Sequence, residues 1–401
     1  MMLNELDSQL VCTVRRGDEI AGYVVIDSTV AGQACGGLRM LPDIDEAEMR
    51  GLARAMTLKY GLLGLPRGGA KAGLRGDPNA PTAERKEQLL WFGRAIAPLL
   101  RGRHYVPGSD MGTDAVDIRH LLEAAGLRVG RREQRSVRSG YYTGLTVFTG
   151  VARAASHLGL SLAGSRAAIE GFGKVGSAVA RLLDRAGVAV VAISTIEGAI
   201  YHPAGLDVRQ LTEMAREAGD EVVSRYRDAE PIPPATLLEL PVDFLSPCAR
   251  HNSVRADNAP RVQARAICPG ANNPLTPEAE QLLLARGVLC LPDFATNCGG
   301  VLGGAMEFAA LSEDQIAATI DDRIGARIDW IIEESVRRGT SPRAVATELA
   351  LRRFRAMQRA AARPTPFSRL LDLGLDLYRR GWIPAPLVAV LSQPYFERCL
   401  S

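Results

Sequence analysis

The sequence predicts an α/β fold that combines a doubly wound parallel sheet with a second domain. Short apolar runs alternate with helix-length segments between about residues 140 and 300, which is the pattern of a parallel sheet covered by helices. Within this region, a G-x-G-x-x-G string at residues 171–176 follows an apolar run and opens an amphipathic segment. The chain has 401 residues, 47% of them hydrophobic, so it is too long for one ordinary core and can bury two.

The N-terminal part shows signals for both strands and helices. Residues 11–28 suit two strands around a turn at residues 16–18. Residues 46–63 carry apolar side chains at helical spacing, and residues 82–100 form a second helical pattern behind Pro81. We expect the glycine-rich segment between these two helices to be a loop.

The C-terminal part shows the alternation that defines the fold class. We expect helices over residues 141–158 and 174–186, with a short strand at 167–170 between them. The expected strands that follow are 188–193, 244–245, 266–267 and 288–291. Residues 313–362 are helical in pattern, and residues 365–401 are an added helical tail rich in proline and aromatic residues.

Composition excludes several classes of protein. The 48 basic and 45 acidic residues are interspersed, which argues against a nucleic-acid partner. No apolar run approaches the roughly 20 residues that span a bilayer, and the N-terminus lacks a signal-peptide pattern. The seven cysteines show no C-x-x-C spacing and the five histidines no H-E-x-x-H pattern. We therefore predict a cytoplasmic protein with free thiols, no protein-bound metal and no membrane partner.

Lysine is rare in this sequence, which draws attention to where it is kept. Only Lys59, Lys71, Lys86 and Lys174 occur among the 48 basic residues. Arginine cannot replace lysine where an amine must lose its proton, although composition bias suffices to explain Lys86. Lys71 lies among glycines that let a substrate approach and exclude water, which lowers the pKa of an amine. Lys59 shares the apolar stripe of its helix, so it either reaches solvent at the helix edge or pairs with an anion.

Two further segments carry groups suited to a small polar substrate. Gly36 and Gly37 offer backbone N–H groups to a carboxylate. Asp110 lies in a turn flanked by glycines, where most aspartates only stabilise the turn.

The glycine string at residues 171–176 predicts a Rossmann-type dinucleotide site. Its first glycine allows a tight turn, the second admits the pyrophosphate, and the third packs the helix on the strand. The N-terminus of the helix supplies N–H groups and a favourable dipole for phosphates. Thr195 stands where a carboxylate usually accepts from the ribose 2′-OH. Either Glu197 takes that part or a 2′-phosphate is tolerated, so NAD and NADP both stay open.

Taken together, these segments resemble the glutamate/leucine/phenylalanine/valine dehydrogenases, which oxidatively deaminate amino acids with NAD or NADP. The resemblance covers about residues 10–360 in unbroken order. Its motifs are Gly36-Gly37-Leu38-Arg39, Met56-Thr57-Leu58-Lys59, Leu65 to Gly73, Pro107 to Thr113, Thr143-Gly144, Ile169 to Gly176, Pro247-Cys248-Ala249, Gly270 to Pro274 and Pro292 to Val301.

The resemblance implies a domain organisation. A substrate-binding and oligomerisation domain would span residues 1–138, and a dinucleotide-binding domain residues 139–344. Helices in residues 345–401 would return to the first domain, and the tail from about residue 365 has no counterpart in the shorter members. The active site would lie in the cleft between the domains, and the protein would form homo-oligomers.

The resemblance also implies roles for single residues. Lys59, with Gly36 and Gly37, would bind the substrate α-carboxylate; Lys71 would activate water, and Asp110 would move protons to and from the amino nitrogen. Asn272 would line the substrate side of the cleft. The implied cofactor-binding residues are Gly171, Phe172, Gly173, Lys174, Val175, Gly176, Thr143, Thr195 and Asn297. The products would be a 2-oxo acid and ammonia.

Departures from the family pattern bear on the substrate. Glutamate-specific members carry a lysine at the position of Cys35 and a serine at that of Gly304, so both partners of a side-chain carboxylate are missing. Gly108 resembles the phenylalanine-specific members, whereas Val301 keeps the leucine-type residue. We predict a hydrophobic, bulky or aromatic substrate. Glutamate dehydrogenase is the alternative enzyme, and an inactive cofactor-binding regulatory protein is the alternative of another class.

Overall fold

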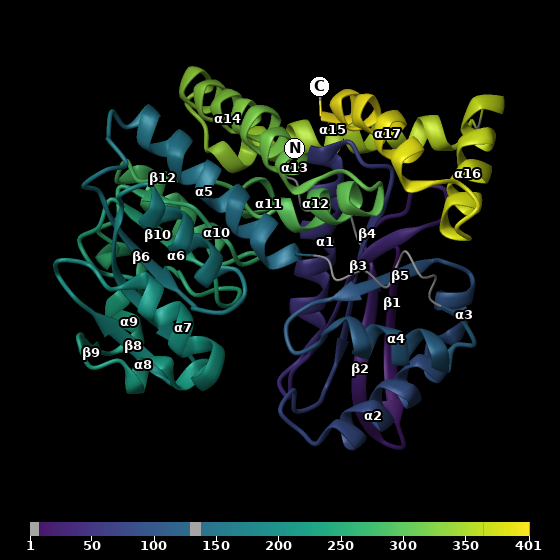
Figure 1. Cartoon of the computed structure of the whole chain (residues 1–401), viewed down its shortest axis with the longest axis horizontal. Helices are drawn as coiled ribbons and strands as arrows, with labels where there is room; N and C mark the ends of the chain where they lie inside the picture. The colour runs from purple at the N-terminus through teal and green to yellow at the C-terminus, as the bar shows by residue number, and fades with distance from the viewer. Residues whose placement is uncertain (1–7, 129–137, 364, 401) are drawn as a thin grey trace. The chain divides into compact units, whose positions relative to one another are not determined.

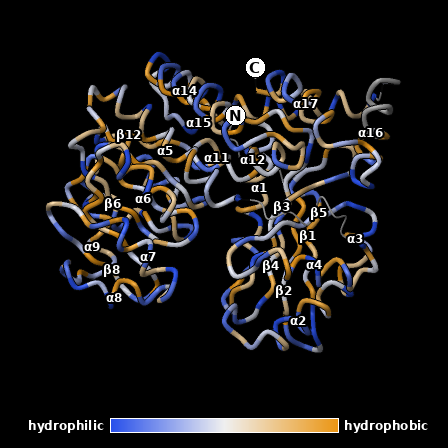
Figure 2. Tube along the Cα trace, in the orientation of Figure 1, coloured by the Kyte–Doolittle hydropathy of each residue, from blue (hydrophilic) through white to orange (hydrophobic). Residues whose placement is uncertain are grey.

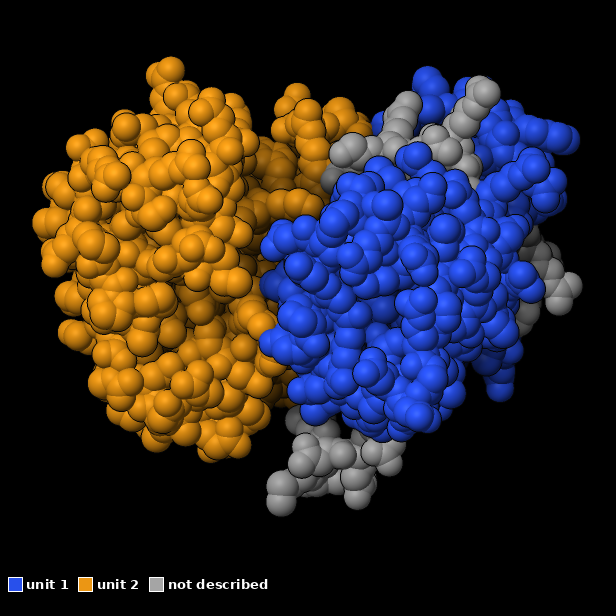
Figure 3. Space-filling model, turned by 90° about the horizontal axis from the view of Figure 1, so that it is seen from below, with its two compact units in different colours: residues 1–136, 308–310, 349–399 blue, residues 137–307, 311–348, 400–401 orange. Residues whose placement is uncertain are grey.

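A computed structural model describes residues 8–128, 138–363 and 365–400. The chain divides into two compact units (Figure 1 and Figure 3). Unit 1 comprises residues 1–136, 308–310 and 349–399, and unit 2 comprises residues 137–307, 311–348 and 400–401. In both units the strands carry hydrophobic residues (Figure 2).

Unit 1 is built on a five-stranded sheet with the order β1-β2-β4-β3-β5. The first two strands form the expected hairpin, and β2 also pairs antiparallel with β4. In contrast, β3, β4 and β5 run parallel to one another. The strands are β1 (Leu10–Arg16), β2 (Glu19–Ile26), β3 (Ala34–Met40), β4 (Gly68–Leu74) and β5 (Tyr105–Ser109).

The glycine-rich segment that we expected to be a loop is the fully buried strand β4. Helix α1 (Glu46–Leu63) packs against this strand, and a Cβ atom on Gly73 would lie 2.5 Å from Ile44 Cγ2. At Gly69 a Cβ atom would overlap the backbone of Thr57. The loop prediction was therefore wrong because these glycines permit close approach of a helix to a strand and do not mark a turn.

The helices of unit 1 follow their local signals closely. Helix α1 has the predicted bounds; Asp45 caps its first turn by accepting from the Glu48 N–H, and Gly64 ends it with φ of 68°. The predicted helix over 82–100 is divided at Ile96 into α2 (Thr82–Ala95) and α3 (Ala97–Arg101). Unit 1 also contains α4 (Ala115–Ala124), α16 (Pro366–Arg379), α17 (Ala385–Leu400) and most of α15 (Pro342–Ala361).

Unit 2 is built on a seven-stranded sheet with the order β12-β11-β10-β6-β7-β8-β9. The strands from β12 to β7 are parallel, as predicted, but β8 and β9 are antiparallel additions at one edge. The prediction missed them because both are very short and β9 contains Pro231. The strands are β6 (Arg166–Glu170), β7 (Ala189–Thr195), β8 (Gly198–Tyr201), β9 (Glu230–Ile232), β10 (Phe244–Pro247), β11 (Ala266–Ile267) and β12 (Leu289–Cys290).

Helices cover the sheet of unit 2 and continue into the C-terminal part of the unit (Figure 1). They are α5 (Ser139–His157), α6 (Gly176–Arg185), α7 (Val208–Ala218), α8 (Val222–Arg225), α9 (Pro234–Leu237), α10 (Pro277–Ala285), α11 (Asp293–Thr296), α12 (Gly299–Phe308), α13 (Glu313–Thr319) and α14 (Gly325–Arg338). Short 3-10 turns occur at Gly219–Glu221 and Ala259–Arg261, and a π-helical turn at Ile320–Ile324.

Several expected absences can be compared with the described part of the chain. All seven cysteines are free thiols. Within residues 8–128, 138–363 and 365–400 we find no group of three or more metal-ligating side chains. In the same ranges, no helix is both long and apolar enough to cross a membrane.

Candidate active site

Four charged side chains from the parallel strands and the first helix of unit 1 meet in one cluster. Lys71 projects from β4 with 1% of its side chain exposed, and its Nζ donates to Oδ2 of Asp110, which follows β5. Arg39 on β3 donates through Nε to Asp110 Oδ1 over 3.0 Å. Its Nη1 donates to Glu48 Oε1 on α1 over 2.5 Å. Cations and carboxylates therefore alternate from Lys71 to Glu48.

Glycines on β3 leave the space that this cluster occupies. A Cβ atom on Gly37 would lie 2.7 Å from the Cβ of Asp110. The ladder between β3 and β4 pairs Cys35 with Gly69 and resumes only at Leu38 and Ala72, so it skips Gly36 and Gly37. The structure thus brings both glycines beside the Lys71–Asp110 pair.

Burial and neighbouring charges determine the protonation of this pair. Burial lowers the pKa of Lys71, and the positive charge of Arg39 lowers it further, while Asp110 opposes both effects. Burial alone would raise the pKa of Asp110, but the charges of Lys71 and Arg39 hold it below its usual range. The site therefore contains an ionised carboxylate beside an amine that loses its proton more readily than a free lysine.

The remaining predicted substrate residues of unit 1 lie on adjacent elements. Lys59 on α1 is only 5% exposed, which excludes the interpretation that it reaches solvent at the helix edge. Gly108 on β5 pairs with Gly37 and has open space where a side chain would begin.

Cys35 has a more polar environment than the sequence indicated. Burial raises the pKa of its thiol, and the positive charges of Arg67, Arg103 and Arg379 partly offset that effect. The Tyr60 hydroxyl also hydrogen-bonds with the thiol. Arg379 belongs to α16 in the C-terminal tail, so no local sequence signal connected it with Cys35.

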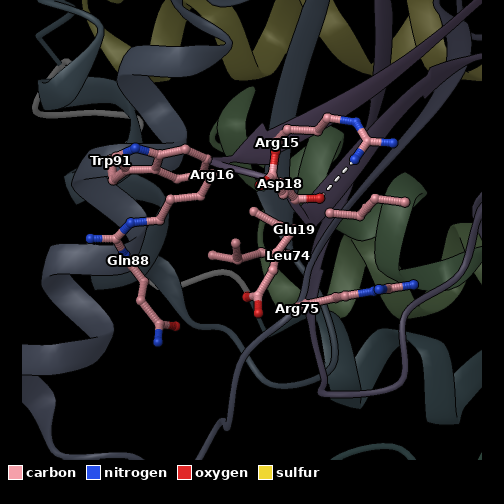
Figure 4. Close-up of a pocket in the computed structure, with 10 residues that line it drawn as sticks. Arg15, Arg16, Asp18, Glu19, Leu74, Arg75, Gln88 and Trp91 are labelled. Atoms are coloured by element: carbon pink, nitrogen blue, oxygen red, sulfur yellow. Dashed lines mark hydrogen bonds between the residues drawn. The ribbon is translucent and has the colours of Figure 1, made fainter.

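One hollow in unit 1 lies apart from this cluster. Figure 4 shows it at the β1–β2 turn, beside α2. It encloses about 660 Å³, and the Arg16 guanidinium lies over the Trp91 ring at its edge. None of the residues that line it belongs to the predicted site.

In unit 2 the glycine string forms a strand–turn–helix cradle. Gly171 takes a left-handed φ of 88° and donates through its N–H to Ser194 Oγ over 3.0 Å. A Cβ atom on Gly176 would overlap the Gly171 carbonyl, whereas Gly173 faces open space. These environments fit a diphosphate held at the N-terminus of α6.

The other members of the string support its shape. Phe172 is 5% exposed and Val175 directly precedes α6. The Cβ of Lys174 lies against Gly140 at the start of α5. Glu170 lies just before the string, and no sequence pattern indicated a role for it. Burial raises the pKa of its carboxyl to about 7. A partly neutral carboxyl there repels a bound diphosphate less than a full charge would.

Thr195 ends β7, and its hydroxyl forms hydrogen bonds within the protein. Its Oγ1 donates to the Asp220 carbonyl over 2.7 Å and accepts from the Glu197 N–H over 3.2 Å. The Glu197 side chain is exposed.

The two predicted asparagines of unit 2 are in direct contact. Asn297 donates through Nδ2 to Asn272 Oδ1 over 2.9 Å and also to the carbonyls of Gly270 and Ala271. Its Oδ1 is buried and has no hydrogen-bond partner among the described residues. Thr143 on α5 lies beside the start of α12, where Val301 and Gly304 are half-buried one turn apart.

The comparisons with known proteins agree with this architecture. Residues 136–361 match the family described as Glutamate/Leucine/Phenylalanine/Valine dehydrogenase. Residues 7–125 match the Glu/Leu/Phe/Val dehydrogenase dimerisation domain. The chain belongs to this family. It is an amino acid dehydrogenase by descent, and the predicted α/β fold class is confirmed.

Curated relatives of this dehydrogenase carry glutamate dehydrogenase names. Glutamate dehydrogenase of Thermotoga maritima is 35% identical over 70% of each chain. An NAD-specific glutamate dehydrogenase of Staphylococcus aureus is 30% identical over 83% of this chain and 84% of the relative. An NADP-specific one of Saccharolobus shibatae is 31% identical over 82% and 83%.

Solved structures of similar fold include enzymes with different named substrates. Hetero-hexameric glutamate dehydrogenase of Thermus thermophilus, in its Leu-bound form, has a TM-score of 0.76 at 27% identity and covers 88% of this dehydrogenase and 89% of that chain. L-tryptophan dehydrogenase of Nostoc punctiforme has a TM-score of 0.61 at 26% identity, with coverages of 88% and 98%.

Proposed function

We propose that this dehydrogenase reversibly deaminates a hydrophobic L-amino acid to its 2-oxo acid and ammonia, with NAD or NADP as oxidant. The observation that carries the proposal is the buried ion pair between Lys71 and Asp110, in which the pKa of the lysine is lowered. A lysine whose pKa is lowered exchanges protons with water during turnover more readily than a fully charged surface lysine does.

The residues of unit 1 would divide the work among them. Lys59 and the backbone at Gly36 and Gly37 hold the α-carboxylate. Asp110 would first take a proton from the substrate ammonium group. A bound nicotinamide would supply the hydride acceptor for Cα, so that an iminium group is left on the substrate. Lys71 would take a proton from the water that adds to this carbon, and Asp110 would return its proton to the nitrogen. As the C–N bond breaks, the new hydroxyl would give its proton to Asp110, so that ammonia and the 2-oxo acid leave, and Lys71 and Asp110 then release their protons to water.

The residues of unit 2 would hold the dinucleotide. The cradle at residues 171–176 takes the diphosphate, and Thr143 and Asn297 line the nicotinamide end. The buried Oδ1 of Asn297 supports this proposal, because it has no hydrogen-bond partner among the described residues. The carboxamide of a nicotinamide would offer it an N–H donor.

We expect weak discrimination between NAD and NADP. The Thr195 hydroxyl hydrogen is used within the protein, and no Arg or Lys lies within five residues to bind a 2′-phosphate. The ratio of kcat/KM with NAD to kcat/KM with NADP should therefore correspond to a free-energy difference of no more than about 1–2 kcal/mol, the scale of one hydrogen bond. A thousandfold preference would show that a group outside this strand end selects the cofactor.

We expect a hydrophobic and bulky substrate because the residues that the family resemblance assigns to the pocket are small and uncharged. Neither Cys35 nor Gly304 can pair with a side-chain carboxylate, and burying such a group unpaired is unfavourable by several kcal/mol, on the order expected for an unsatisfied charge. The open space at Gly108 leaves room for a large side chain, and one similar structure is named L-tryptophan dehydrogenase.

Gly304→Val should shift the preference from aromatic toward aliphatic amino acids by roughly tenfold, the worth of one or two methylenes in a pocket. The ratio of kcat/KM for phenylalanine and leucine measures the shift. Gly374→Val, on a glycine with open space in the tail helix α16, is the matched control and should leave the ratio unchanged. An unchanged ratio in Gly304→Val would exclude Gly304 from the pocket.

Glutamate is the second candidate substrate, and one structural observation favours it. Arg67, Arg103 and Arg379 lie close enough to Cys35 to lower the pKa of its thiol, so cationic groups are present on this side of the site. A panel of amino acids with each cofactor, followed through absorbance of the reduced nicotinamide at alkaline pH, separates the candidates. Faster turnover of glutamate than of phenylalanine, leucine or tryptophan would reject the hydrophobic substrate. Cofactor binding without any turnover would favour an inactive regulatory protein.

We further propose that the protein works as a homo-oligomer in the cytoplasm. The dimerisation-domain match over residues 7–125 supports self-association, and seven free thiols suit a reducing compartment. Light scattering of the purified protein tests the first part.

A further inference from the structure

Behind the Lys71–Asp110 pair lies a second ion pair that the proposed mechanism does not use. The side chains of Arg39 and Glu48 are 5% and 2% exposed. Burying two charges in this way is expensive, and a buried pair is often no more stabilising than well-packed apolar side chains. Stability alone is therefore a weak reason for this pair.

The geometry connects the second pair directly to the first. Arg39 divides its guanidinium between two carboxylates, with Nε on Asp110 at 3.0 Å and Nη1 on Glu48 at 2.5 Å. Asp110 in turn divides its two oxygens between Arg39 and Lys71. A change in charge at Arg39 or at Glu48 must therefore alter how strongly Asp110 holds the Lys71 ammonium.

We propose that Arg39 and Glu48 are positioning residues that bias the protonation of Lys71 in opposite directions. Arg39 competes for Asp110 and favours the neutral amine, whereas Glu48 neutralises Arg39 and favours the ammonium. The inference rests on the proposed function, in which the neutral Lys71 amine accepts a proton.

The charged groups around Lys71 come from three packed elements. They are Asp110 after β5, Arg39 on β3 and Glu48 on α1. Arg39 lowers the pKa of Lys71 and Glu48 raises it, although burial has the largest effect. Helix α1 also carries Lys59, and β5 carries Tyr105, whose phenol stays neutral because burial raises its pKa.

Two substitutions should move the titration of Lys71 in opposite directions. Arg39→Met leaves Lys71 as the main cationic partner of Asp110, so the ammonium persists to higher pH. Glu48→Gln removes one of the two carboxylates that Arg39 contacts, so the positive charge of Arg39 acts more strongly on Lys71 and the amine is neutral from lower pH. Each shift should be about one pH unit, which is what one charge at this range and partial screening produces. The acid limb of kcat/KM against pH should move up in the first variant and down in the second.

A second readout does not depend on turnover. Because the chain has only four lysines, protein grown with ε-¹³C-lysine gives four lysine signals, and Lys71→Arg identifies the one from Lys71. Titrating that signal in each variant reports the pKa of Lys71 directly. Asp117→Asn, which changes another buried carboxylate paired with an arginine in unit 1, is the matched control.

The outcomes separate this inference from the proposed function. Shifts of opposite sign in the Lys71 signal support the inference even if no amino acid is turned over, and absent turnover would then reject only the proposed function. A Lys71 titration that stays fixed, or that moves the same way in Arg39→Met and Glu48→Gln, overturns the inference. If Arg39→Met does not fold, Arg39→Gln tests the same sign because it also removes the charge.

Discussion

Lys71→Arg should reduce kcat at least about a hundredfold, the usual scale for loss of acid–base catalysis, while cofactor binding persists. A guanidinium keeps its proton at any pH at which the protein is folded, so it cannot take one from water. The pKa of Lys71 is lowered by burial and by Arg39, and arginine cannot reproduce that adjustment. The longer arginine side chain must also fit into a buried space, because only 1% of the Lys71 side chain is exposed.

Steady-state turnover and fluorescence titration of the reduced cofactor together measure this prediction. Lys86→Arg is the matched control, because Lys86 is exposed on α2 and should give wild-type rates. Thermal unfolding of both variants shows whether the arginine at position 71 is accommodated. Near-normal turnover in a folded Lys71→Arg protein would exclude Lys71 as the base.

Local signals were sufficient for much of the fold. Helix α1 could be predicted to the residue because an apolar stripe runs along it and Asp45 and Gly64 flank its two ends. The glycine string of unit 2 could be predicted because its strand and helix are adjacent in sequence. The order of strands in the five-stranded sheet had no such signal, and β4 was mistaken for a loop because the helix that its glycines admit acts at long range.

The residues of the site likewise divide into those that local motifs indicate and those that only the folded chain brings together. Lys71 and Asp110 could be chosen from their motifs, but their contact joins residues 39 positions apart. Arg39 belongs to one of the family motifs, but the sequence predicted no role for it, because its contact with Asp110 spans 71 positions. Arg379 reaches the surroundings of Cys35 only because the C-terminal tail belongs to unit 1. Composition and residue spacing do not predict such long-range contacts, which only the folded structure shows.

Asp110→Asn should reduce kcat by about two to four orders of magnitude, because a carboxamide cannot carry a proton to or from the substrate nitrogen. The substitution also leaves Lys71 and Arg39 without the carboxylate that they share. Two buried cations then repel, so the pKa of Lys71 should fall further. Raising the pH should therefore not restore turnover, whereas it would restore a variant whose only defect was an over-protonated lysine.

A pH series of kcat for Asp110→Asn separates proton transfer from packing. Removing one partner of a buried ion pair destabilises proteins by about 3–5 kcal/mol, so thermal unfolding has to accompany the kinetics. Asp114→Asn is the matched control: it makes the same substitution four residues on, at the N-cap of α4, where asparagine caps as well as aspartate. That variant should keep both its stability and its turnover. If Asp110→Asn unfolds at a lower temperature but turns over normally below it, Asp110 only holds Lys71 in place, and the proton reaches the substrate nitrogen from another group.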